Sequence, residues 1–163
     1  CVQIVKGLYE TDKSVPGYLL AGSIYGPSYI SFEYAMSYYG LIPEAVYTVT
    51  SATFEKKKKK RYETSFGTFT YCDVPAEAFP LELILVQEGD YFYRIASPEK
   101  AVCDKLYTMS PTANIKELYT LLADDLRIDM DALKKLDQSK LAQLSGKYHS
   151  TNVKKLCSLI RRL

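Results

Sequence analysis

The first two thirds of the chain alternates short apolar runs with glycine-containing turns. Val, Ile, Thr, Tyr and Phe, the residues favoured in strands, are concentrated in these runs. Gly67 and Gly89 fall in short connections between neighbouring runs, where a positive φ suits a hairpin turn. We therefore predict antiparallel sheet built from hairpins, with strands at residues 46–50, 61–64, 68–74, 83–87 and 91–95.

Helical spacing dominates the last third. A short helix is already expected between Ser31, as its cap, and Gly40, as its stop. From Ser97-Pro98 onward, apolar residues recur three and four positions apart behind a series of capping candidates: Ser97, Asn114, Asp129, Asp137 and Thr151. The last helix is expected to bury Val153, Leu156, Cys157, Ile160 and Leu163. The prediction is a single α+β domain over residues 1–163, with hairpin sheet followed by a run of about five helices.

Composition limits the class of protein. The chain has 163 residues, of which 47% are hydrophobic and 25% charged, as in one soluble globular domain. Its apolar stretches are far shorter than a membrane span requires, so no membrane partner is expected. The four cysteines lie far apart and no segment resembles a signal peptide, which predicts a reducing, cytoplasmic location.

The net charge is only +2, but positive and negative residues are strongly segregated along the chain. Residues 1–55 carry a net −3 and residues 62–133 a net −8, whereas residues 56–61 carry +6 and residues 134–163 carry +7. This asymmetry predicts a polyanion partner, with faces merely bathed by salt and water as the plainer interpretation. The first set of candidate contacts is a basic run that is expected to form a mobile loop: Lys56, Lys57, Lys58, Lys59, Lys60 and Arg61. The second set, expected on one rigid helical face, is Lys147, Lys154, Lys155, Arg161 and Arg162.

Residues suited to catalysis are few. The one histidine, His149, lies in a predicted loop, where a surface role is commoner than catalysis. Asp124, Asp125, Asp129 and Asp131 are close in sequence, but helix capping explains them better than metal binding. Neither a P-loop nor a dinucleotide fingerprint is present. We therefore expect no catalytic residue, no metal site, no cofactor and no enzymatic activity.

Four segments together resemble the AbiEi family of antitoxins. Two adjoin each other, Pro27–Glu44 and Val46–Ser51, and the match continues through Phe66–Tyr71 and Ile95–Asp104. It extends more loosely through the helices beyond, so that it covers nearly the whole chain. The order of the segments also agrees with that family.

The resemblance implies a regulatory function. AbiEi-like proteins combine an N-terminal winged helix-turn-helix with an α+β domain, and act in type IV toxin-antitoxin operons of abortive infection, a form of phage defence. The winged domain would bind operator DNA as a transcriptional autoregulator, with non-specific help from basic surfaces. The second domain would antagonise a nucleotidyltransferase-like toxin, for which no stable complex is required. No enzymatic role is implied.

The start of the chain departs from that pattern, because no recognition helix precedes the sheet. Residues 1–9 are expected to form one strand, the remnant last strand of the wing, and the chain is expected to be the C-terminal antitoxin domain. Two alternatives remain open. One is a metal-dependent nucleic-acid-processing enzyme that uses the four aspartates. The other is a plain RNA-binding domain that stacks bases on Phe69 and Tyr71, since Phe66–Tyr71 partly echoes an RNA-recognition motif.

Overall fold

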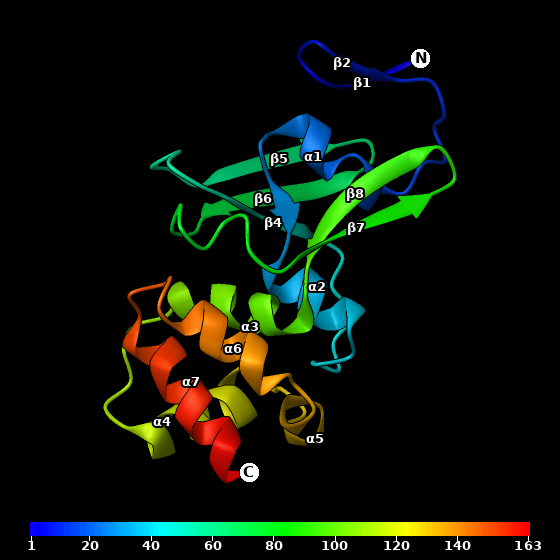
Figure 1. Ribbon diagram of the computed structural model, residues 1–163. Coiled ribbons are helices and arrows are strands. Elements are labelled where there is room, and N and C mark those ends of the chain that lie inside the picture. Colours follow the sequence, from blue (N-terminus) through cyan, green and yellow to red (C-terminus); the bar gives the residue numbers. More distant parts are fainter.

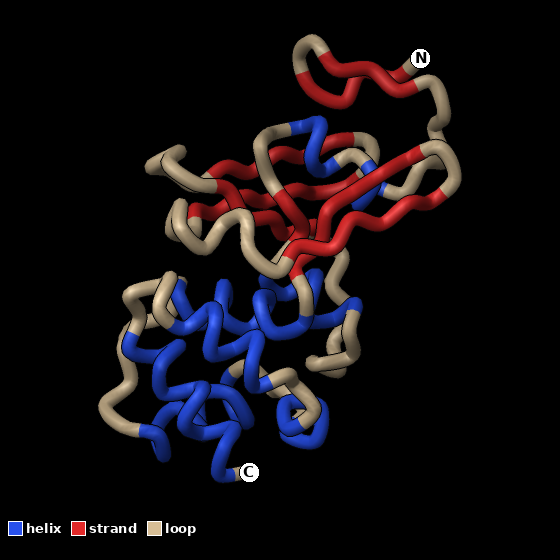
Figure 2. The backbone as a smooth tube through the Cα atoms, viewed as in Figure 1, coloured by secondary structure: helices blue, strands red, loops and turns tan.

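The β-branched and aromatic runs form a six-stranded sheet in the order β5-β6-β4-β3-β8-β7. The structure is a computed structural model and describes all residues, 1–163. In Figures 1 and 2 the strands occupy one layer and most of the helices a second layer beneath it. The strands are β3 (Tyr29–Ile30), β4 (Val49–Thr53), β5 (Lys60–Thr64), β6 (Gly67–Asp73), β7 (Leu83–Glu88) and β8 (Tyr91–Ala96).

The two predicted hairpins are confirmed. Strands β5 and β6 pair antiparallel across a turn that ends at Gly67, whose φ is +123°. Strands β7 and β8 pair antiparallel around Gly89, whose φ is +60°. Glycine tolerates this left-handed region because it has no Cβ.

The predicted α+β fold class is confirmed, but the sheet is mixed and not purely antiparallel. Strand β4 pairs parallel with β6, and β3 pairs parallel with β8, while β3 and β4 are antiparallel. After β4 the chain passes over one strand position to form β5 at the edge, and β6 then folds back between them. Local hairpin signals fix each pair of neighbours but not the order in which the pairs assemble.

The helical third of the chain forms five α-helices, as predicted. They are α3 (Pro98–Tyr107), α4 (Ile115–Thr120), α5 (Met130–Lys134), α6 (Gln138–Ser145) and α7 (Thr151–Arg162), and a π-turn at Leu121–Asp125 follows α4. Four predicted caps accept the expected backbone hydrogen bonds: Ser97, Asn114, Asp129 and Asp137. The fifth prediction was wrong by one residue, because Ser150 rather than Thr151 caps α7. None of the helices is long and apolar enough to cross a bilayer.

Residues 1–9 were expected to form one strand but fold into a hairpin of their own. Strand β1 (Val2–Val5) and strand β2 (Leu8–Glu10) pair antiparallel, and Gly7, with a φ of +86°, lies in the turn. This hairpin lies beyond the sheet, on the side away from the helical layer (Figure 1). Its link to β8 is a hydrogen bond of 3.1 Å that the Tyr91 hydroxyl donates to Glu10.

Short helices cover both faces of the sheet. The 3-10 helix η1 (Gly17–Leu19) and α1 (Ala21–Ile24) lie on one face, where the Tyr71 hydroxyl donates to the Ala21 carbonyl at 2.6 Å. Helix α2 (Phe32–Tyr38) and α3 lie on the opposite side, between the sheet and the remaining helices (Figure 1). The core is therefore continuous through both layers.

A buried carboxylate joins the two layers. Asp104 of α3 is fully buried and accepts hydrogen bonds from Tyr29 at 2.7 Å, from Ser31 at 2.6 Å and from Tyr148. The Lys100 ammonium, one helical turn earlier, lies 4.0 Å from the Asp104 carboxylate and donates to the Ala78 carbonyl. We call these residues the Asp104 cluster.

Burial dominates the electrostatics of this cluster. It raises the pKa of Asp104 against the lowering effect of Lys100 and the three hydroxyls. Burial also lowers the pKa of Lys100, although Asp104 opposes the shift. Each of the two charges makes the burial of the other tolerable. Removing one therefore leaves the other buried without a partner, at the full cost of its desolvation.

We expect Asp104→Asn to lower the free energy of unfolding by about 3–5 kcal/mol, the usual cost of leaving a buried charge without its partner. Chemical denaturation followed by circular dichroism measures this. The double variant Lys100→Met, Asp104→Asn should recover part of the loss, because it also removes the stranded cation. A single variant as stable as the original protein would contradict this role.

Candidate functional site

A groove runs between the sheet and the C-terminal end of α3. It has a volume of about 370 Å³ and is bordered by β4, β5, β6, the start of α2 and the last turn of α3. The basic residues on its border are Lys59, Lys60, Arg61 and Lys105, and the acidic one is Glu33. Thr50, Thr70 and Thr108 also border it, and the hydroxyls of Thr50 and Thr108 donate to the carbonyls of Ser31 and Lys105. We call this the basic groove.

Strand geometry places the cations of the basic run on two sides. Arg61 pairs with Thr70 across β5 and β6, so the two side chains share the groove face of the sheet. Lys60 pairs with Tyr71 and therefore projects to the other face, where its ammonium lies 6.0 Å from the centre of the Tyr25 ring. The basic groove thus receives Arg61, whereas Lys60 contributes its charge to the η1 and α1 side.

Carboxylates only partly neutralise the groove. Lys105 forms an ion pair of 2.6 Å with Glu33, and Arg61 forms an exposed one of 3.2 Å with Glu63. Lys59 is exposed and makes no ion pair or hydrogen bond. Because exposed ion pairs are weak, Arg61 can exchange Glu63 for an incoming phosphate at little cost. The groove therefore presents cations to an anion.

Cys72 also borders this groove, as a thiol of low reactivity. Burial raises the pKa of Cys72 above the usual value, and the nearby Lys59 opposes that shift only in part. A thiol with a raised pKa carries little thiolate at neutral pH, and the thiolate is the nucleophilic form. Cys72 therefore contributes to the wall of the groove.

The basic run is not the free loop that we predicted. Lys56 donates to the Gly26 carbonyl at 3.0 Å and lies 5.0 Å from the centre of the Tyr25 ring. The Lys57 amide donates to the Asp73 carboxylate at 2.7 Å, and Lys60 and Arg61 already belong to β5. Contacts of the cations with an aromatic ring and the pairing of β5 thus hold the run against the sheet.

Three of the five residues in the second predicted basic set share one exposed side of α7. Lys154, Arg161 and Arg162 are exposed on α7, but Lys155 turns inward and donates to the Thr112 carbonyl. Lys147 lies in the loop before α7, at the opposite end of that helix from Arg161 and Arg162. Leu163, expected on the buried face, is exposed. Lys154, Arg161 and Arg162, at positions i, i+7 and i+8, share one side of α7, and Lys155 does not add a free charge to it.

The residues on which the two alternative functions depend have structural roles in the fold. Asp129 caps α5 by accepting from the Asp131 amide at 2.9 Å, and no group of three or more His, Cys, Asp or Glu side chains is arranged to hold a metal ion. Phe69 and Tyr71 are buried in the core, so neither ring is open to stack a base, and the RNA-binding interpretation of these two residues was wrong. His149 is exposed beside Glu77 at 3.5 Å.

Sequence reasoning missed Lys105, the cation that α3 contributes to the groove. It lies next to the buried Asp104 on a helix whose other residues are mostly buried, and nothing in the local pattern connects it with residues 59–61. The Lys105 ammonium borders the groove only because α3 packs under the sheet. That packing is a long-range property of the fold.

Comparison with known proteins gives little further information. No model of a known protein family matches the chain, and no curated protein matches it. Among solved structures, the crystal structure of JHP933 from Helicobacter pylori is similar, with a TM-score of 0.36 and 14% sequence identity. The similarity covers 90% of this chain and 87% of that one. At this TM-score the likeness is too distant to support an argument about fold or function.

Lys154 and Lys155 should respond differently to the same substitution. Lys155→Met removes the donor to the Thr112 carbonyl and should lower the free energy of unfolding by about 1–2 kcal/mol. Lys154→Met, the matched change one residue earlier, removes only an exposed charge and should change it by less than about 0.5 kcal/mol. Urea denaturation of both variants measures the difference. Equal stabilities would show that Lys155 is as free as its neighbour.

Proposed function

We propose that this chain is a non-enzymatic antitoxin domain of the AbiEi type, and that its basic groove contacts the phosphate backbone of nucleic acid. The function is antagonism of a nucleotidyltransferase-like toxin encoded in the same operon, within type IV toxin-antitoxin phage defence. Joined to a winged helix-turn-helix, the domain adds non-specific DNA affinity to an autoregulator that acts in the cytoplasm.

The observation that carries the nucleic-acid contact is the convergence of Lys59, Arg61 and Lys105 on one groove. These cations come from a loop, a strand and a helix, so the fold itself brings them together. The Arg61 guanidinium and the ammonium groups of Lys59 and Lys105 offer both charge and hydrogen-bond donors to phosphate oxygens. Such contacts strengthen binding without reading the base sequence.

The antitoxin part of the proposal rests on the resembling segments, and the structure gives them a shared physical role. Pro27–Glu44 contributes Tyr29 and Ser31 to the Asp104 cluster, and Ile95–Asp104 contributes Lys100 and Asp104 itself. Two of the four segments that carry the resemblance are thus in direct contact at the centre of the fold. Agreement at such positions supports a shared architecture for the domain.

Replacing Lys59 and Arg61 together by Gln should flatten the salt dependence of DNA binding. Each phosphate contact on duplex DNA adds about −0.9 to the slope of log affinity against log salt, so the slope should become less negative by about 2. Fluorescence anisotropy with a labelled duplex at several salt concentrations measures it. The reduction should be the same for unrelated duplex sequences, because phosphate contacts carry no base information.

The matched control is Lys134→Gln with Lys135→Gln, which removes two exposed positive charges beside α5, away from the groove. This pair should leave the slope nearly unchanged. If both double variants flattened the slope equally, only net charge would matter and the groove would have no special role. A slope unaffected by Lys59→Gln and Arg61→Gln would remove the groove from the proposal.

Growth of a host strain tests the antitoxin function directly. The product of the adjacent gene in the operon, expressed alone, should arrest growth, and co-expression with this chain should restore it. Asp104→Asn should restore growth poorly, because the unstable domain accumulates less in folded form. A harmless neighbouring product, or arrest that the folded chain does not relieve, would contradict the antitoxin proposal.

A further inference from the structure

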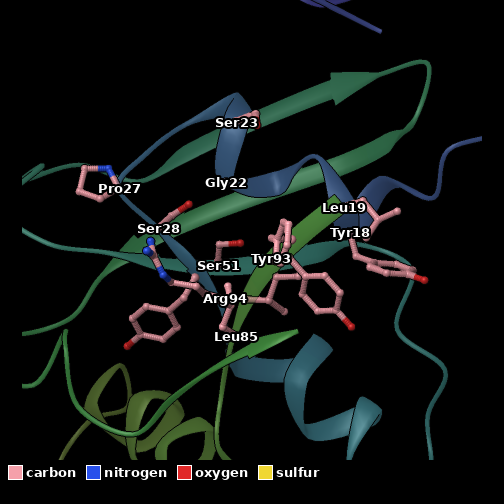
Figure 3. Close-up of a pocket in the computed structure, with 13 residues that line it drawn as sticks. Tyr18, Leu19, Gly22, Ser23, Pro27, Ser28, Ser51, Leu85, Tyr93 and Arg94 are labelled. Carbon is pink, nitrogen blue, oxygen red and sulfur yellow. The ribbon is translucent and has the colours of Figure 1, made fainter. Parts of the chain in front are cut away.

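A second pocket opens where the sheet splits. Strand β3 pairs with β8 only at Ile30 and Ile95, so β8 diverges from the neighbouring strands on the side of Tyr93. The pocket left in this gap has a volume of about 290 Å³ and lies between β8, β4 and the α1 segment (Figure 3). A pocket of this size is near the lower limit for small-molecule sites. We call it the split-sheet pocket.

The floor of the split-sheet pocket carries an unused hydroxyl group. Ser51 of β4 is only 1% exposed, and its Oγ has no hydrogen-bond partner. Figure 3 shows this hydroxyl directed into the middle of the pocket. Buried polar atoms in proteins are nearly always paired, and an unpaired one costs free energy. A polar group of a ligand in the pocket would supply the partner that Ser51 lacks.

One end of the pocket suits an anion. The Arg94 side chain extends along the pocket toward Ser28 and Pro27 (Figure 3), and its guanidinium forms no ion pair or hydrogen bond within the chain. The residues that line the pocket include no aspartate or glutamate. A free guanidinium with several donors in one plane matches the oxygens of a phosphate group.

The other end suits a flat ring. Tyr18 and Tyr93 line the pocket there and pack edge to face, with ring centres 5.4 Å apart. A hydrogen bond of 2.5 Å from the Tyr18 hydroxyl to Glu88 fixes the orientation of the pair. Aromatic side chains held in this way provide a surface against which a heterocyclic base can pack.

We propose that the split-sheet pocket binds a nucleoside monophosphate. The phosphate lies against Arg94, a sugar hydroxyl meets Ser51 in the middle, and the base packs at the Tyr18 and Tyr93 end. This order of groups follows the order of partners along the pocket. The site is independent of the proposed antitoxin function and of the basic groove, although Ser51 borders both.

The test is titration of the whole chain with AMP, with adenosine and with inorganic phosphate, followed by calorimetry and by amide NMR shifts. AMP should bind and shift the amides of Ser28, Ser51 and Arg94, while adenosine and inorganic phosphate should each bind at least tenfold more weakly, since each fills one end of the pocket. If adenosine bound as tightly as AMP, the anionic end would be wrong. Absence of AMP binding at millimolar concentration would overturn the proposal.

Two variants locate the ligand. Arg94→Gln should weaken AMP binding about tenfold or more, because it removes a charge-assisted contact. Ser51→Ala should weaken it about fivefold without lowering the thermal stability of the free protein, since the hydroxyl has no partner there to lose. Arg162→Gln, an exposed arginine at the end of α7, is the matched control and should leave AMP binding unchanged.

The same variants separate this proposal from the function of the groove. Arg94→Gln should leave the salt slope of DNA binding at its original value. Lys59→Gln with Arg61→Gln should leave AMP binding unchanged. If Arg94→Gln left AMP affinity intact while Lys59→Gln with Arg61→Gln abolished it, the nucleotide would belong to the basic groove and the split-sheet pocket would be excluded as its site.

Discussion

The Asp104 carboxylate is buried where the two layers meet, and the fold depends on the groups that surround it. A buried charge is tolerated only when cations and hydrogen-bond donors surround it, and here the donors come from β3, from α3 and from the loop before α7. The requirement therefore fixes where the helical layer meets the sheet. Both candidate sites depend on that junction, because α3 supplies Lys105 to the basic groove and β3 defines the split beside β8.

Local structure was predictable because local interactions decide it. The two hairpins, the caps at Ser97 and Asn114, and the five C-terminal helices each depend on residues a few positions apart. Ser31 shows where this reasoning ends. It precedes α2 as predicted, but its hydroxyl donates to Asp104 and makes no capping hydrogen bond. A distant buried charge thus outcompeted the local partner, and the parallel strand pairs escaped prediction for the same long-range reason.

The candidate sites were predictable only as a list of charges. The sequence indicated the basic run, but the partners that decide which cations are free are distant along the chain: Tyr25 for Lys56, Thr112 for Lys155 and Glu33 for Lys105. No sequence signal pointed to Ser51 or Arg94. An unpaired hydroxyl is a property of the surroundings and not of the residue, so it becomes visible only once the strands are placed.

The positions of these residues separate two kinds of constraint. Lys100 and Asp104 are buried and hold the two layers together, whereas Lys59 and Arg61 are exposed and can change without loss of the core. The buried cluster therefore constrains the fold, and the choice of ligand is made at groups that the core does not need. For this reason the decisive variants are the exposed cations, whose replacement alters binding while the fold remains intact.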